Sequence, residues 1–213
     1  MHAFIGEFVG TALLIILGDG VVANVVLNKT KGNNSGWIVI TLGWGMAVFI
    51  AVYAATKLGG GGHVNPAVTI AMAAFNHFDT SLVAAYIGGQ FAGAITGAII
   101  VWLAYKQHFD TTADKDLKLA VFCTAPAIRN TGHNVLTEII GTFVLVFGAL
   151  ALSPAASSLG SLDALPAGLL VLAIGLSLGG PTGYAINPAR DLGPRIVHFL
   201  LPIPGKRDSD WGY

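Results

Sequence analysis

Five long apolar stretches alternate with shorter polar segments along the chain. They lie near residues 3–27, 37–56, 81–105, 134–153 and 164–180. A helix needs about 20 apolar residues to cross the hydrocarbon core of a bilayer, so each stretch is predicted to be a membrane-spanning helix. The segments between them are polar and rich in turn residues, and they are predicted to be loops. The main predicted loops are "NKTKGNNS", residues 106–133 and "SPAASSLGSLDALP".

Two further apolar pieces, residues 66–77 and 188–201, are too short to span a bilayer, and each follows an asparagine directly. Asn is a favoured N-cap and Pro suits the first helical position, so each Asn-Pro-Ala triplet predicts a helix start. A helix that starts inside the hydrocarbon exposes unpaired N–H groups, which is tolerated only within protein or beside a water-filled cavity. Two re-entrant half-helices beside a lumen are therefore predicted. The triplets are Asn65, Pro66 and Ala67, and Asn187, Pro188 and Ala189.

The two halves of the chain resemble one another. The segment "GEFVGTALLIILG" from Gly6 parallels "TEIIGTFVLVFGA" from Thr137, and an Asn-Pro-Ala triplet follows in each half. We therefore expect one transmembrane channel domain over residues 1–213, with repeats at 1–105 and 134–213. A repeat of three crossings ends on the side opposite to its start, so the second copy is inverted and the half-helices meet at mid-membrane.

The predicted fold is an all-α integral membrane protein, an inverted-repeat bundle of five visible helices and two half-helices. Only "PIPGKRDSDWGY" follows residue 201, so the third span of the second repeat is not visible. A complete channel is expected to have a sixth helix, and the sequence is expected to continue; the alternative is a non-functional fragment. Glycines four residues apart predict close helix packing. These are Gly6 and Gly10, and Gly89, Gly93 and Gly97.

Composition narrows the function classes. Hydrophobic residues make up 54% of the chain, charged residues 10%, and the mean hydropathy is +0.71, which is typical of a membrane protein. Eleven basic and eleven acidic residues balance, which argues against a nucleic-acid partner. The single cysteine, Cys123, excludes an internal disulfide. No metal-ligand spacing, nucleophile elbow or phosphate loop occurs, so neither a cofactor, a metal site nor an enzyme is predicted.

The two triplets also predict what the lumen favours. Each Asn oxygen can cap its own helix while its NH2 group donates to a passing oxygen. The positive ends of both helix dipoles face the lumen and disfavour cations, so neutral, oxygen-bearing solutes are expected. The glycine run before the first triplet predicts extended backbone whose carbonyls line the lumen. Those carbonyls belong to Gly61, Gly62, His63 and Val64.

Inverted repeats with two Asn-Pro-Ala half-helices resemble the aquaporin superfamily, and "NPARD" resembles its glycerol-facilitator branch. The resemblance covers essentially the whole chain. It implies a passive channel for glycerol, water and possible further solutes such as dihydroxyacetone, urea or protonated lactic acid. It also implies a homotetramer with one pore per subunit in the lipid bilayer of the cell membrane, and a cytoplasmic N-terminus.

By the same resemblance, Arg190 is the cation of the selectivity filter, rather than an interfacial arginine that reaches toward headgroups. Trp44 and Tyr184 are the expected aromatic walls, and Gly175 is expected to leave a wider, more apolar opening. Carbon-bound hydrogens of a polyol would slide along the rings while its hydroxyls bond Arg190 and backbone carbonyls. The second set of carbonyls is expected from Gly183, Tyr184 and Ala185. Glycerol channels usually have phenylalanine at the position of Tyr184, which leaves the solute range open.

Acidic residues inside predicted spans raise the alternative of an ion- or proton-coupled secondary transporter. The resemblance instead gives Glu7 and Glu138 a structural role as acceptors for backbone N–H groups of the re-entrant loops, and assigns Gln90 and Asp191 to structural support. Asp19 lies within the first span, where this branch usually has no acid; a wet vestibule is one explanation, and its role stays open. A third class, a protein of packing or adhesion without transport, does not explain the doubled half-helices.

The family commonly has a histidine before the first triplet, and by this resemblance His63 is expected to pack behind the pore with its backbone carbonyl facing in; proton sensing is the alternative. The distribution of cations disagrees with a cytoplasmic N-terminus, because the positive-inside rule places the richer side in the cytoplasm. Loops one, three and five carry Lys29, Lys31, Lys106, Lys115, Lys118, Arg129, Arg190, Arg195, Lys206 and Arg207, whereas the opposite side has Lys57. The family orientation is retained as the expectation, since pore arginines and long loops are poor topology signals.

Overall fold

The structure, a computed structural model, describes residues 2–75, 78–151 and 158–212, and its regular elements there are all helical. The helices are α1 (His2–Val26), α2 (Trp37–Lys57), α3 (Pro66–Ala74), α4 (Val83–Thr111), α5 (Lys115–Phe122), α6 (Thr131–Ala151), α7 (Leu165–Leu178) and α8 (Pro188–Leu200). Short 3-10 turns, Thr80–Leu82 and Gly160–Ala164, precede α4 and α7. Within the described ranges, five helices are long and apolar enough to cross a membrane. The all-α class and the five spans are therefore confirmed.

The predicted spans and half-helices match the observed ones closely. Their described boundaries differ by at most three residues, except at the end of the third span. The predicted end of the fourth span, at residue 153, lies outside the described residues, as do residues 76 and 77 of the first half-helix. The boundaries of the two repeats stay a prediction.

The prediction that residues 106–133 form a loop is wrong for much of its length. Helix α4 continues to Thr111, and the short helix α5 follows. The Asp114 side chain caps α5 by accepting from the N–H groups of Asp116 and Leu117, at 2.8 and 3.3 Å. The apolar side of α5 is buried, with the Phe122 ring stacked on Phe109 at 5.4 Å between centroids. A short amphipathic helix is invisible to a search for long apolar stretches.

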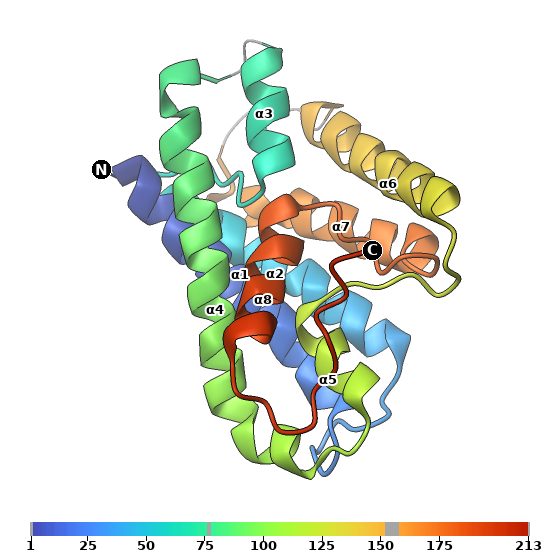
Figure 1. Cartoon of the computed structure of the whole chain (residues 1–213). Coiled ribbons are helices and arrows are strands. Elements are labelled where there is room, and N and C mark those ends of the chain that lie inside the picture. The colour runs from blue at the N-terminus through green and yellow to red at the C-terminus, as the bar shows by residue number, and fades with distance from the viewer. Residues whose placement is uncertain (1, 76–77, 152–157, 213) are drawn as a thin grey trace.

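The two half-helices occupy the middle of the molecule. Figure 1 shows α3 and α8 beginning near one another and running in opposite directions, with the long helix α4 alongside both. Helix α1 packs between α2 and α4. This arrangement encloses the triplets at the helix starts, where Asn65 and Asn187 are both buried.

Glycine allows α1 and α4 to touch backbone to backbone. A Cβ atom built on Gly93 would lie 2.3 Å from the carbonyl oxygen of Phe8, and one on Gly89 would lie 2.6 Å from that of Phe4. On the other face of α1, a Cβ on Gly6 would lie 2.7 Å from the carbonyl oxygen of Ala55. The predicted close packing of small residues is therefore confirmed.

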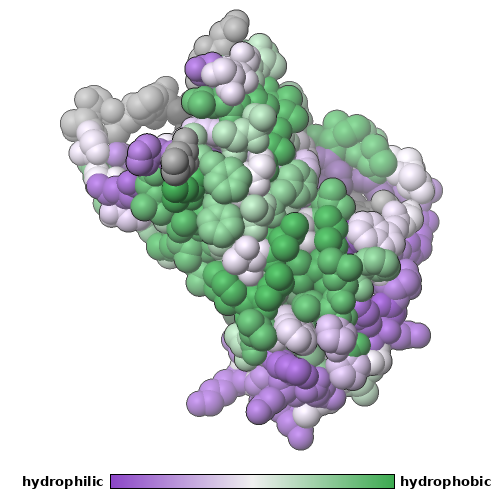
Figure 2. Space-filling view, turned by 60° about the vertical axis from the view of Figure 1, so that its left-hand side comes forward, coloured by the Kyte–Doolittle hydropathy of each residue, from purple (hydrophilic) through white to green (hydrophobic). Residues whose placement is uncertain are grey.

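The outer surface suits a lipid environment. Figure 2 shows a broad hydrophobic surface over the middle of the molecule and hydrophilic residues gathered at its lower end. Helix α6 contributes strongly to this exposed apolar area. So many apolar side chains would be unfavourable in water, whereas the hydrocarbon of a lipid bilayer accommodates them. The exposed apolar side chains of α6 include Val135, Leu136, Ile139, Ile140, Phe143 and Phe147.

Cations of the odd-numbered loops bind partners both within these segments and between them. Lys118 and Lys206 donate to backbone carbonyls of Pro204 and Leu201. Ion pairs join Arg129 to Asp210, Arg195 to Asp191 and Arg207 to Asp116. Structural use of these charges gives a physical reason for their abundance on one side that is independent of membrane orientation.

The contact between α1 and α4 predicts an unusual response to alanine. Alanine normally improves a helix relative to glycine, by up to about 1 kcal/mol. At Gly93 we expect Gly93→Ala to destabilise the protein by about 1–3 kcal/mol, because the added methyl group overlaps the Phe8 carbonyl. Thermal unfolding of the detergent-solubilised protein measures the effect. The control is Gly88→Ala, whose Cβ would meet only the Phe4 ring at 3.6 Å; equal unfolding temperatures for both variants would contradict the packing argument.

Candidate solute pore

Each half-helix is capped by its asparagine. The Asn65 side-chain oxygen accepts from the N–H of Ala67 at 2.9 Å, and Pro66 occupies the first helical turn. The Asn187 oxygen accepts from the N–H groups of Ala189 and Arg190, at 3.0 and 3.2 Å. These bonds satisfy N–H groups that a helix start inside a membrane would otherwise leave unpaired.

The two asparagines also bind across to the opposite loop. The NH2 group of Asn65 donates to the Ile186 carbonyl at 2.9 Å, and that of Asn187 donates to the Val64 carbonyl at 2.8 Å. Sequence reasoning directed both NH2 groups to the lumen and did not anticipate these crossed bonds. Each NH2 group has two hydrogens, so one bond of this kind leaves a second donor on each asparagine.

The loops before the triplets share an unusual backbone. In the first loop, Gly62 and Val64 have φ angles of 71° and 43°; in the second, Tyr184 and Ile186 have 41° and 40°. Positive φ is rare for β-branched residues and costs about 1–3 kcal/mol at a non-glycine residue. Both loops therefore need compensating contacts that hold them in place.

Two carboxylates, the buried Glu7 and the half-buried Glu138, provide those contacts. Glu7 accepts from the N–H groups of His63 and Val64 at 3.0 and 2.7 Å, and Glu138 accepts from those of Ala185 and Ile186 at 3.1 and 2.9 Å. Since both consecutive N–H groups face the glutamate, the carbonyls are left to face the other way, as in other backbone anion nests.

Further polar groups brace these glutamates and the second half-helix. Gln90 donates to Glu7 at 2.7 Å and to the Thr69 hydroxyl at 2.9 Å. The hydroxyl of Thr182 donates to Glu138 at 2.6 Å. On α8, Asp191 accepts from the Thr124 hydroxyl at 2.7 Å and from Arg195 at 2.8 Å, so it ties α8 to the segment after α5.

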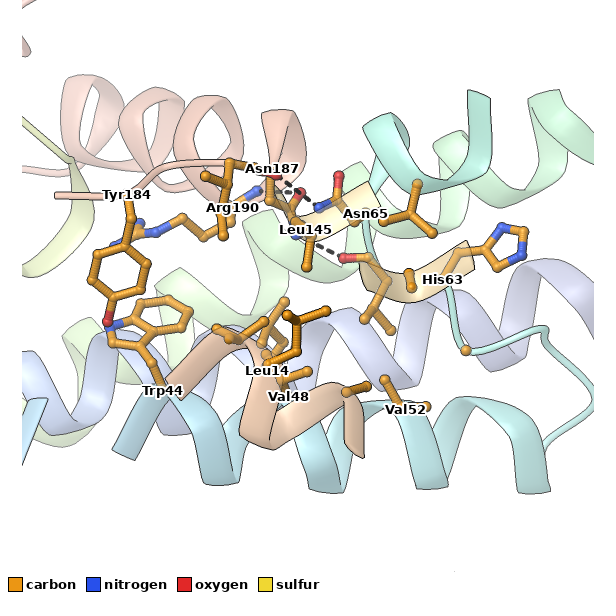
Figure 3. Close-up of a pocket in the computed structure, with 18 of the residues that line it drawn as sticks. Leu14, Trp44, Val48, Val52, His63, Asn65, Leu145, Tyr184, Asn187 and Arg190 are labelled. Atoms are coloured by element: carbon orange, nitrogen blue, oxygen red, sulfur yellow. Dashed lines mark hydrogen bonds between the residues drawn. The ribbon is translucent and has the colours of Figure 1, made fainter. Parts of the chain in front are cut away.

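A cavity of about 230 Å³ runs past both triplets. Figure 3 shows Trp44, Tyr184 and Arg190 at one end, the two asparagines midway, and His63 at the other end. One wall is polar, formed by Arg190, the two loops and the asparagines. The facing wall is apolar, and sequence reasoning missed its members because they are ordinary residues of long apolar helices. They include Leu14, Val48, Val52, Leu145, Leu170 and Val171.

One end of the cavity combines one cation with two aromatic rings. The guanidinium carbon of Arg190 lies 4.3 Å from the centre of the Trp44 ring, and its Nη1 donates to the Phe122 carbonyl at 3.3 Å. Such stacking is a favourable cation–π contact that fixes the plane of the guanidinium. Arg190 is buried rather than extended toward a membrane surface.

Gly175 on α7 and Gly179 at the C-cap of that helix make room for Tyr184. A Cβ on Gly175 would lie 2.9 Å from the Tyr184 ring and one on Gly179 would lie 2.5 Å from it. The space above Gly175 is thus filled by tyrosine rather than left open. Trp37, which sequence reasoning did not single out, donates to the Gly175 carbonyl at 3.2 Å and packs edge-on against Tyr184 at 5.9 Å. No pattern in the sequence distinguishes Trp37 from an interfacial tryptophan.

His63 and Asp19 are the two predicted residues whose roles the sequence left open. His63 packs against the rings of Phe78 and Tyr86, both at 4.8 Å, and its Nδ1 is 3.1 Å from the Thr69 hydroxyl. Asp19 is completely buried, which rules out a wet vestibule around it, and it lies 3.6 Å from Arg190.

The predicted residues that line the cavity are Trp44, Gly61, Gly62, His63, Val64, Asn65, Tyr184, Ala185, Asn187 and Arg190. Gly175, Gly183 and the Pro-Ala pairs are not part of this lining.

Comparison with known proteins places this geometry in a family. The family model described as major intrinsic protein matches residues 1–205. The chain belongs to the major intrinsic protein family. As a member of this family of membrane channels, the protein is not an enzyme.

Three similar proteins cover nearly the whole chain. A probable glycerol uptake facilitator protein of Thermotoga maritima is 60% identical over 100% of this chain and 90% of its own length. A D/L-lactic acid transporter of Lactiplantibacillus plantarum is 41% identical over 100% of this chain and 88% of its own length. The X-ray structure of the aquaglyceroporin from Plasmodium falciparum superposes with a TM-score of 0.83 at 33% identity, covering 95% of this chain and 83% of that one.

The bracing of the first loop predicts the effect of removing a charge. Glu7→Gln replaces one acceptor oxygen by an NH2 donor that faces other donors, so we expect a loss of about 1–3 kcal/mol in the free energy of unfolding. Thermal unfolding in detergent measures this loss, with Asp110→Asn, an exposed carboxylate change, as control. The double variant Glu7→Gln with Gln90→Glu restores one acceptor and is expected to recover part of the loss. Wild-type stability of the single variant would refute the proposed role of Glu7.

Proposed function

We propose that this chain is a passive channel for glycerol and related small polyols, which also conducts water, in the cell membrane. The observation that carries the proposal is the division of the cavity into one polar and one apolar wall. A polyol in extended form has hydroxyls along one edge and carbon-bound hydrogens along the other. Such a solute can exchange its hydration for hydrogen bonds on one side and apolar contact on the other.

We assign the selectivity filter to Trp44, Tyr184, Arg190 and Gly175. Arg190 presents several N–H donors in a fixed plane to solute hydroxyls. The rings of Trp44 and Tyr184 contact the carbon skeleton, and the position of the Tyr184 ring is set by Gly175. The carbonyls of the lining residues Gly61, Gly62, His63, Val64, Tyr184 and Ala185 then accept from the hydroxyls along the lumen, whereas Gly183 is not part of that lining.

We assign exclusion of ions and protons to the centre of the pore. Two helix N-termini meet there, and their positive ends raise the energy of a cation. The second hydrogen of each asparagine NH2 group supplies a donor to a passing oxygen. A water molecule that accepts from both asparagines directs its own hydrogens away from them. This orientation interrupts proton transfer along a single file of water molecules in the pore.

The alternative, an ion- or proton-coupled transporter, needs carboxylates that load and release a cation. Glu7 and Glu138 instead accept several hydrogen bonds that hold the strained loops. Protonation during each transport cycle would release those loops. The arrangement supports passive permeation.

Protonated lactic acid is a second candidate solute, because one relative is described as a D/L-lactic acid transporter. The neutral acid has a hydroxyl and a carboxyl on a short carbon chain, so it matches the same divided cavity. Dihydroxyacetone and urea have similar size and neutral polar groups. We further propose a homotetramer with one pore per subunit and a cytoplasmic N-terminus.

The transport proposal predicts fast glycerol entry without accumulation. In stopped-flow light scattering on proteoliposomes, we expect a glycerol flux that rises linearly with concentration and stops at equal concentrations on both sides. Sodium or proton gradients are expected to have no effect, because the Glu7 and Glu138 carboxylates are engaged by the re-entrant loops. A hexitol, too wide for the filter, serves as the control solute. Uphill glycerol accumulation on a proton gradient would establish the coupled transporter instead.

The packing of Tyr184 on Gly175 predicts a size-dependent loss. In Gly175→Ala, the added methyl group displaces the Tyr184 ring toward the lumen, so glycerol flux is expected to fall about tenfold or more while water flux falls less. The control is Gly180→Ala, where a Cβ would meet nothing within 4 Å. A proportional loss of water and glycerol flux in Gly175→Ala would show that Tyr184 does not set the solute size.

A further inference from the structure

A carboxylate sits behind the proposed selectivity filter, outside the lumen. Asp19, on α1, has no exposed surface and is absent from the cavity lining, whereas Arg190 belongs to that lining. The distance from the Asp19 Oδ1 to the Arg190 Nη1 is 3.6 Å. Neither carboxylate oxygen has a hydrogen-bond partner among the described residues.

The neighbouring residue explains how α1 reaches this position. Gly18 lies directly under the Trp44 ring, where a Cβ would be 2.3 Å from a ring carbon. The close approach of α1 to Trp44 places Asp19 beside the guanidinium that stacks on the same ring. Trp44, Arg190 and Asp19 thus form one packed unit at the end of the cavity where Tyr184 lies.

The charges around Asp19 leave Arg190 as its partner. A buried carboxylate without hydrogen bonds is strongly unfavourable unless a cation compensates it. Three other groups near Asp19 cannot supply a countercharge. Asp191 on α8 is itself negative, and Arg195 is already paired with Asp191. The Cys123 thiol after α5 is uncharged in its ordinary form. Arginine stays protonated under all ordinary conditions, so it supplies a permanent countercharge.

We propose that Asp19 is a specificity-determining residue that acts through Arg190. Its carboxylate compensates the guanidinium charge from behind, so that the filter offers hydrogen-bond donors to the lumen with little net positive charge. Because the separation exceeds hydrogen-bond length, Arg190 keeps its N–H groups for the Phe122 carbonyl and for solute. A filter of this kind accepts a neutral solute, such as an undissociated acid, without attracting the corresponding anion.

The inference rests on the proposed channel function and is tested by ion conductance, which is measured separately from glycerol flux. In Asp19→Asn the shape is kept and the countercharge is lost, so Arg190 acts as a bare cation. We expect nitrate conductance of the reconstituted protein in planar bilayers to rise about tenfold or more, since a charge a few ångströms away changes an anion's energy by well over RT. Asp19→Glu, which keeps the charge, is expected to stay near wild type. Asp110→Asn, an exposed carboxylate change on α4, is the matched control.

A second pair of variants separates compensation of charge from a merely structural role. Arg190→Ala leaves the Asp19 carboxylate without its cation beside the lumen, so a potassium or proton leak is expected. Adding Asp19→Asn to Arg190→Ala removes the remaining charge and is expected to abolish most of that leak. A structural role for Asp19 would make the double variant leak at least as much as the single one.

The outcomes distinguish this inference from the transport proposal. Unchanged nitrate conductance in a folded Asp19→Asn protein, or equal cation leaks in the single and double variants, overturns the inference. If Asp19→Asn elutes as aggregate in size-exclusion chromatography, Arg190→Ala alone decides, because the absence of a cation leak in that folded variant overturns the inference. If wild type fails to conduct glycerol while Asp19→Asn gains nitrate conductance, the glycerol proposal fails and the pairing of Asp19 with Arg190 stands.

Discussion

The pore depends on two glutamates that bind backbone rather than solute. Glu7 and Glu138 each accept the N–H groups of two consecutive residues in a re-entrant loop. This contact holds Val64 and Ile186 at positive φ, a conformation that neither side chain favours by itself. In our proposal, the carbonyls of the same loops line the lumen. An acidic residue inside a membrane protein is usually taken as a sign of ion coupling. Here the two glutamates instead accept backbone hydrogen bonds that hold the re-entrant loops in place.

The crossed asparagine bonds make one unit of the two loops. Each asparagine caps its own half-helix and donates to the loop of the other. Displacement of either half-helix therefore breaks bonds in both, which couples two segments far apart in the chain. Close glycine contacts between α1 and α4 support the same region from outside, because α4 packs beside both half-helices. Asn65, Asn187, Glu7 and Glu138 together accept from backbone N–H groups at both helix starts and in both loops, as a membrane interior requires.

Membership in the major intrinsic protein family and the divided cavity give a consistent account of selectivity. Hydrogen bonding along one wall replaces hydration of hydroxyls, and the apolar wall rejects solutes that need water on every side. Arg190, at the end of the cavity beside Trp44 and Tyr184, can orient a solute without binding it tightly if a nearby negative charge compensates the guanidinium. Asp19 supplies that balance in our proposal, from a place that no solute reaches.

The sequence by itself determined the apolar spans, the two helix starts and the family resemblance, since hydropathy and Asn-Pro-Ala capping are properties of neighbouring residues. Local pattern also located Arg190, which follows its triplet directly. Only the tertiary structure decided that Asp19 lies against Arg190, that Tyr184 fills the space above Gly175, and that each asparagine binds the opposite loop. The helix α5 was missed because its stability comes from burial of one face. These features depend on which distant segments pack together, and one sequence does not record that pairing locally.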